Sequence, residues 1–84
     1  MIVDTSALLA IVFRDTGFAT LIARMDDADL VAAGTPTRVE TGIVLTARLQ
    51  ERADGLLERL LGEFAVQEIA FTEIHWRAPY RRLR

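Results

Sequence analysis

The stretch MIVDTSALLAIVF, residues 1–13, decides the fold class. Its apolar start, residues 1–3, shows no alternation and predicts a strand buried on both faces of a parallel sheet. The Asp-Thr-Ser turn at residues 4–6 follows, and side chains of these types accept the free N–H groups of a helix start. The apolar segment 7–13 then predicts a helix, so the chain opens as strand, polar turn and helix.

Short apolar strands and amphipathic helices alternate along the rest of the chain. The predicted elements are a helix at 18–25, a strand at 30–33, a helix at 36–49 capped by Thr35, a helix at 56–64, a strand at 66–71 and a short helix capped by Thr72. The order β-α-α-β-α-α-β-α implies crossover connections and a parallel sheet, hence a single α/β domain over residues 1–84. Three strands are few for such a sheet, which indicates that strands are missing.

Composition bounds how such a chain is stabilised. The chain has 84 residues, and a domain of roughly 60–80 residues supplies only a few kcal/mol of net stability unless something else holds it together. There is no cysteine, and 51% of the residues are hydrophobic, with a mean hydropathy of +0.23. We therefore expect a metal or a partner chain to stabilise the fold and to cover part of the apolar surface.

Charge and targeting signals narrow the functional class. The net charge of −2 creates no general attraction for nucleic acid. All ten basic residues are arginine, and four of them fall in the last eight residues. This arginine-rich end has two interpretations: it contacts phosphate groups, or it is a solvated chain end. No signal peptide or membrane span is recognisable, so we expect a cytoplasmic protein that does not bind membranes.

Asp4 is the first candidate for chemistry. It follows the first predicted strand and lies at the carboxyl end of that strand. In open α/β sheets, ligands bind at this edge. Position alone leaves two interpretations open, because the same side chain can also cap the following helix.

Glu40 is the second candidate, because it lies among apolar residues on its predicted helix. On a helix that turns by roughly 100° per residue, Ile43 lies about 40° and Glu40 about 100° around the axis from Val39, so Glu40 falls within the apolar arc. This placement predicts a carboxylate inside a core-facing stripe, where a charge needs compensation by a cation. The alternatives are an ion pair to a nearby arginine and a glutamate at the margin of the stripe that reaches solvent.

The two acids are predicted to converge. A helix that follows a parallel strand starts at the edge where the strand ends, so Asp4 and Glu40 can face one site. The hydroxyl groups of Thr5 and Ser6 lie next to Asp4 in the sequence. Oxygen ligands of this kind suit Mg²⁺ or Mn²⁺ and not zinc, and carboxylate-bound Mg²⁺ supports phosphodiester hydrolysis.

These motifs resemble VapC toxins of the PIN-domain family. The similarity lies in the opening Ile-Val-Asp-Thr-Ser-Ala-Leu, in a Thr-x-x-Glu-x-Gly pattern at residues 37–42, and in the strand-to-helix segment 69–75. The resemblance implies a PIN-like three-layer fold, with a short parallel sheet flanked by helices. It also implies a Mg²⁺-dependent endoribonuclease toxin of a type II toxin–antitoxin pair. Asp4 and Glu40 match the first two of four family acids, and Ser6 matches a hydroxyl position near the metal.

The chain departs from the family pattern after residue 75. The third and fourth family acids are missing, since no Asp or Glu follows Glu73. We interpret this departure as C-terminal truncation or a change of reading frame. Two hypotheses follow: a ribonuclease toxin that uses Asp4 and Glu40, or an inactive PIN remnant that acts only as an antitoxin-binding module. The implied partners are a VapB-like antitoxin, held by the early helices, an RNA substrate and a second copy of the chain in a homodimer.

Overall fold

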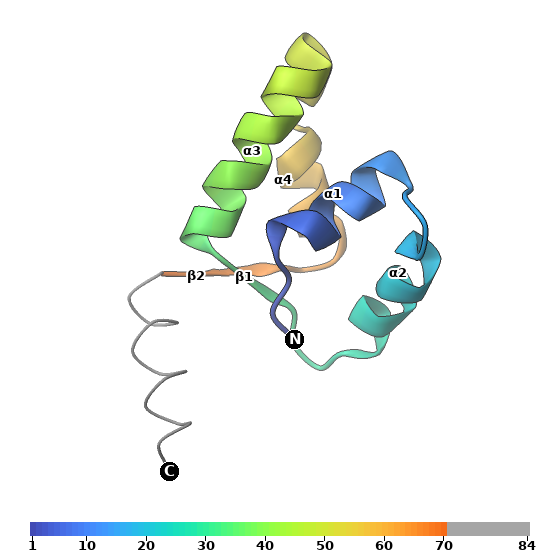
Figure 1. Ribbon diagram of the computed structural model, residues 1–84. Helices are drawn as coiled ribbons and strands as arrows, with labels where there is room; N and C mark the ends of the chain where they lie inside the picture. Colours follow the sequence, from blue (N-terminus) through green and yellow to red (C-terminus); the bar gives the residue numbers. More distant parts are fainter. Residues whose placement is uncertain (71–84) are drawn as a thin grey trace.

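The computed structural model describes residues 1–70, and its elements follow the predicted order (Figure 1). In chain order they are α1 (Thr5–Phe13), α2 (Phe18–Asp27), β1 (Ala32–Gly34), α3 (Thr35–Leu49), the 3₁₀ turn η1 (Gln50–Ala53), α4 (Leu56–Glu63) and β2 (Gln67–Ile69). Every helix predicted up to residue 65 and the strand predicted at 30–33 are confirmed to within two residues at each end. The strand predicted at 1–3 is reduced to a single parallel bridge at Ile2. The helix predicted after Thr72 lies outside the described residues.

The sheet is parallel, as predicted, and β1 lies at its centre. On one side of β1, Ile2 pairs with Ala32 in a parallel bridge, and the Val3 N–H donates to the Ala32 carbonyl at 2.8 Å. On the other side, β2 runs parallel to β1, with Ala32 opposite Gln67. The N-terminal segment, β1 and β2 therefore form three parallel neighbours that end at one edge.

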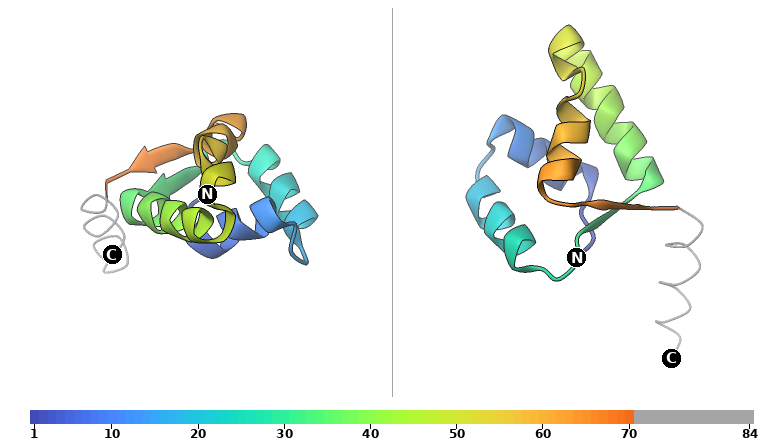
Figure 2. Two further views of the ribbon diagram at one scale, coloured as in Figure 1. Left: turned by 90° about the horizontal axis from the view of Figure 1, so that it is seen from above. Right: turned by 180° about the vertical axis from the view of Figure 1, so that it is seen from behind.

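The hydrophobic core lies on one face of this sheet. The buried cluster joins sheet residues to residues of α1, α2 and α4, and consists of Val3, Leu8, Met25, Val31, Ala33 and Leu60. Figure 1 shows α1, α3 and α4 on the same side of β1 and β2, and the second panel of Figure 2 shows the same arrangement from behind. Within residues 1–70 the fold is thus a small sheet covered by a layer of helices.

The N-terminal segment differs from its prediction in one respect. β1 is buried on both faces, but Ile2 is 60% exposed whereas Val3 is 2% exposed. Successive side chains of a strand point to opposite faces, and Val3 points to the face that carries the buried cluster, whereas Ile2 points away from it. The prediction that residues 1–3 are buried on both faces is therefore wrong for Ile2 and also for Met1, which is 42% exposed.

The buried face of α3 is also not the predicted one. Val39 and Ile43 are 53% and 65% exposed, and Glu40 is exposed as well. The helix instead buries Thr41 and Leu45, at 0% and 1% exposure. The prediction that Glu40 lies inside a core-facing stripe is therefore wrong, because the apolar stripe faces solvent.

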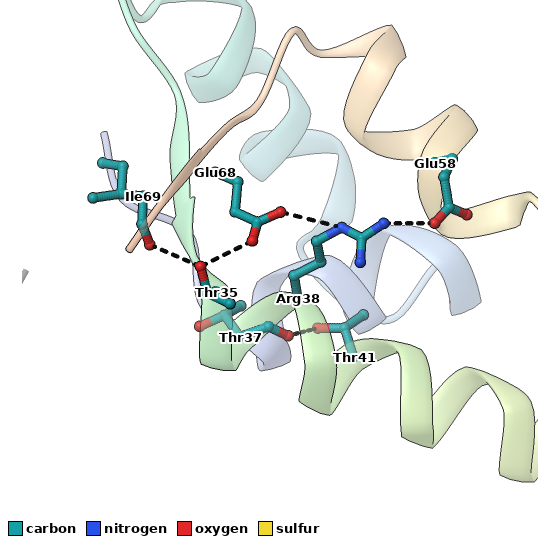
Figure 3. Close-up of polar contacts among 7 residues, drawn as sticks. All are labelled: Thr35, Thr37, Arg38, Thr41, Glu58, Glu68 and Ile69. Carbon is teal, nitrogen blue, oxygen red and sulfur yellow. Dashed lines mark hydrogen bonds and ion pairs between the residues drawn. The ribbon is translucent and has the colours of Figure 1, made fainter. Parts of the chain in front are cut away.

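A local hydrogen bond explains why Thr41, a polar residue, can occupy a fully buried position. The Thr41 hydroxyl donates to the Thr37 carbonyl oxygen one helical turn earlier, at 2.7 Å (Figure 3). A buried hydroxyl bonded in this way leaves no unpaired polar group, so its burial costs little. The methyl group of Thr41 then packs as an apolar side chain would.

The start of α3 corrects a second prediction. Thr35 is not the N-cap: Gly34 occupies that position, with no side-chain cap bond, and Pro36 lies in the first turn. The Thr35 hydroxyl oxygen instead lies 2.9 Å from Glu68 Oε2 and 3.4 Å from the Ile69 carbonyl oxygen (Figure 3). The hydroxyl therefore ties α3 to β2.

No single helix within residues 1–70 has the length and apolar character needed to cross a membrane. α1 and α2 together meet the length and composition, but they are bent by 117° at their junction. Each of them contributes a buried residue, Leu8 and Met25, to the core.

Candidate metal centre

The candidate site lies at the carboxyl edge of the sheet. Extending the Ile2–Ala32 register by two residues places Asp4 level with Gly34, the last residue of β1. α1 begins directly after Asp4, and α3 begins directly after Gly34. The topology therefore brings Asp4 and the starts of both helices to one edge, as the sequence predicts.

Asp4 caps α1. Its Oδ1 accepts the Ala7 N–H at 2.8 Å, and its backbone is extended, with φ −105° and ψ 178°. The cap interpretation is thus confirmed. It does not exclude the functional one, because the side chain is exposed and a carboxylate offers a second oxygen with its own lone pairs. The cap holds the carboxylate in one orientation at the edge.

Glu40 lies in the second turn of α3, on its exposed side. Both ion pairs found within residues 1–70 belong to Arg38, with Glu58 and Glu68 as partners, and neither involves Glu40. The exposure of Glu40 therefore supports the interpretation in which its side chain reaches solvent. A side chain in this position is free to move toward a hydrated cation.

Arg38 fixes the position of α3. Its Nη2 lies 2.7 Å from Glu58 Oε1 on α4, and its Nε lies 3.4 Å from Glu68 Oε1 on β2 (Figure 3). The three side chains are 36%, 60% and 46% exposed, so each pair contributes only about 0–1 kcal/mol. Their effect is geometric, because they hold the helix two residues from Glu40. Sequence reasoning missed this contact, since its partners lie far apart along the chain.

The oxygen ligands at this edge fit a magnesium ion in kind. Thr5 and Ser6 occupy the first turn of α1, immediately after Asp4. Mg²⁺ usually keeps several water ligands and is bound through one or two carboxylates. Within residues 1–70 no group of three or more His, Cys, Asp or Glu side chains could hold a metal. The candidate ligands within residues 1–70 are therefore the carboxylates of Asp4 and Glu40 and the hydroxyl groups of Thr5 and Ser6, with the remaining positions left to water.

Comparison with known proteins agrees with this architecture. The PIN domain matches residues 1–83. VapC ribonuclease Mb2004c of Mycobacterium bovis and ribonuclease VapC36 of Mycobacterium tuberculosis are each 40% identical to the chain over 82 residues, which cover 96% of it. The chain spans 59% of the length of each of these relatives.

Proposed function

Because the chain belongs to the PIN-domain family, we propose that it is the toxin of a type II toxin–antitoxin system. In this proposal it is a Mg²⁺-dependent endoribonuclease that cleaves RNA phosphodiester bonds. The observation that carries the proposal is the register that brings Asp4 to the sheet edge where α3, the helix of Glu40, begins. The names of the two ribonuclease relatives support the same activity.

Asp4 and Glu40 are the proposed metal ligands and catalytic residues. We expect their carboxylates to lie about 4–7 Å apart, within reach of one cation. The Ala7 N–H holds the Asp4 carboxylate in place, and Thr5 and Ser6 would orient water ligands of the ion. When bound, Mg²⁺ (or Mn²⁺) supplies an activated water and charge stabilisation at the phosphate oxygens.

A second candidate function is antitoxin binding without RNA cleavage. The observation that favours it is that residues 1–70 contain no group of three metal-binding side chains. The partner would be a VapB-like antitoxin seated on α1, α2 and α4, where apolar burial contributes about 25 cal/mol per Å² without any metal. We also propose that the protein is cytoplasmic and forms a homodimer. The exposed Val39 and Ile43 support the homodimer, and light scattering would test it by measuring the molar mass.

RNA cleavage tests the metal site. A fluorescent RNA would be incubated with the chain in Mg²⁺ or in EDTA, for the wild type and for the variants Asp4→Asn and Glu40→Gln. We expect either substitution to slow Mg²⁺-dependent cleavage by about 100-fold or more, because each removes a charge from the site. Asp26→Asn on α2 and Glu51→Gln on η1 are matched controls, since both acids are exposed and lie outside the candidate site.

The same assay separates the two candidate functions. Cleavage that survives both Asp4→Asn and Glu40→Gln would show that these acids do not form the active site. A wild-type chain that binds the product of its neighbouring antitoxin gene but cleaves no RNA would favour the binding module.

A further inference from the structure

Arginines gather around one cleft at the far ends of α1 and α3. Arg14, Arg52 and Arg59 line this cleft, which has a volume of about 570 Å³. The guanidinium carbon of Arg48 lies 5.0 Å from the centroid of the Phe13 ring, and Phe13 lines the same cleft. Three of the six arginines of residues 1–70 therefore line what we call the arginine cleft, and Arg48 lies beside it on the Phe13 ring.

The floor of the arginine cleft is apolar and comes from three helices. The apolar lining consists of Ile11, Val12, Phe13, Leu49, Leu56 and Leu60. Glu63 is the only acid among the lining residues. All four arginines are exposed, and neither ion pair found within residues 1–70 involves them. Their guanidinium groups are thus available to an anionic ligand.

The charge distribution makes this cleft the place for a polyanion. Residues 1–70 carry eleven carboxylates against six arginines, and two of these carboxylates, Asp4 and Glu40, lie at the candidate metal site. An RNA strand brought to that edge meets negative charge there and needs cationic contacts elsewhere. Of the two remaining arginines, Arg38 is paired with Glu58 and Glu68. The arginine cleft therefore supplies the contacts that the edge lacks.

We propose that the arginine cleft binds the phosphate backbone of single-stranded RNA, at a site separate from Asp4 and Glu40. This inference rests on the proposed ribonuclease function. Guanidinium groups match phosphate oxygens in two-point contacts. RNA is the favoured occupant because one strand can reach both this cleft and the candidate metal edge along α1 and α3, and an acidic peptide is an outcome of the test.

The distance between the two sites suits one RNA strand. α1 leads from Asp4 to Arg14, ten residues later, which at 1.5 Å per residue is about 15 Å. α3 leads from Glu40 toward Arg48 in the same way. At 3.4 Å per stacked nucleotide, about four nucleotides span this separation. An RNA strand that is cut at the candidate metal site would thus be bound by the arginine cleft about four nucleotides from the cleaved bond.

RNA binding without metal tests the proposal. Fluorescence anisotropy of a 5′-labelled single-stranded oligouridine, measured in EDTA, would compare the wild type with Arg14→Gln, Arg52→Gln and Arg59→Gln. We expect each variant to weaken binding about fivefold and to reduce the slope of log affinity against log salt by about one. Arg24→Gln on α2 is the matched control, because Arg24 is exposed and lies outside the cleft. Glu63→Gln should raise the affinity about twofold, a gain that misfolding cannot produce.

Two outcomes would overturn the inference. One is equal loss of binding in Arg24→Gln and in the cleft variants, or no loss in any of them. The other is displacement of the RNA by an acidic leucine-containing peptide at lower concentration than by unlabelled oligouridine, which would assign the cleft to a protein partner. Because the assay contains no divalent cation, failure here leaves the metal site standing, and failure of the cleavage assay leaves the cleft standing.

Discussion

α1 and α3 begin at the same edge of the sheet but satisfy their polar groups differently. α1 starts with a side-chain cap, the bond from the Ala7 N–H to Asp4. α3 starts without one, and it buries Thr41 while it exposes Val39. The difference teaches that a polar residue can be buried wherever a neighbouring turn of the helix supplies its hydrogen-bond partner, so the polarity of a residue alone does not predict its exposure. Thr41 has such a partner in the preceding turn.

The two candidate acids differ in whether their carboxylates make a hydrogen bond within the fold. Asp4 makes a structural hydrogen bond in addition to any role at a metal. Glu40 is exposed and belongs to neither ion pair of residues 1–70. A substitution at Asp4 therefore mixes stability with chemistry, whereas a substitution at Glu40 reports on chemistry alone.

The largest expected effect on stability separates the two faces of α3. Leu45→Ala should lower the free energy of unfolding by about 2–5 kcal/mol, because it leaves a cavity at a fully buried position. Ile43→Ala should change it by less than about 1 kcal/mol, since Ile43 is 65% exposed. Urea unfolding followed by circular dichroism measures both. Equal losses in the two variants would show that Ile43 is buried in solution, for example by a second copy of the chain.

Much of the fold could be predicted because local signals agree with the tertiary structure. The polar turn after the first strand predicts both the cap at Asp4 and the start of α1, and the structure confirms them. The stripe on α4 is confirmed in the same way, with Leu57 and Leu60 buried. α3 could not be oriented from its sequence, because its apolar stripe faces solvent and its buried threonine looks polar.

The candidate site was predictable in part for a related reason. A strand end and the helix that follows a neighbouring strand share an edge in any parallel sheet, so Asp4 and the helix of Glu40 could be placed from the element order. The contacts of Arg38 and the arginine cleft could not, since their members are distant in sequence and meet only through packing. Charge counts along the chain do not reveal such a gathering.

A smaller effect on stability tests the cap of α1. Asp4→Ala should lower the free energy of unfolding by about 1 kcal/mol, because it removes the acceptor of the Ala7 N–H. Asp4→Asn should cost only a few tenths of a kcal/mol, since an asparagine oxygen accepts the same bond. Thermal unfolding of the metal-free chain measures the difference. If Asp4→Asn were as destabilising as Asp4→Ala, the negative charge itself would hold the start of the helix.

The smallest expected effect concerns the buried hydroxyl of Thr41. Thr41→Val removes a hydrogen bond worth about 1 kcal/mol and replaces the hydroxyl with an apolar methyl that gains about 0.8 kcal/mol on burial. The Thr37 carbonyl keeps the helical N–H of residue 41 as its donor, so no polar group is left unpaired. The free energy of unfolding should therefore stay within about 0.5 kcal/mol of the wild type. Thr41→Ser, which keeps the hydroxyl but loses the methyl, should cost about 1 kcal/mol. The reverse order, with Thr41→Val the more damaging of the two, would show that the hydroxyl bond and not the methyl packing holds this face of α3 against the core.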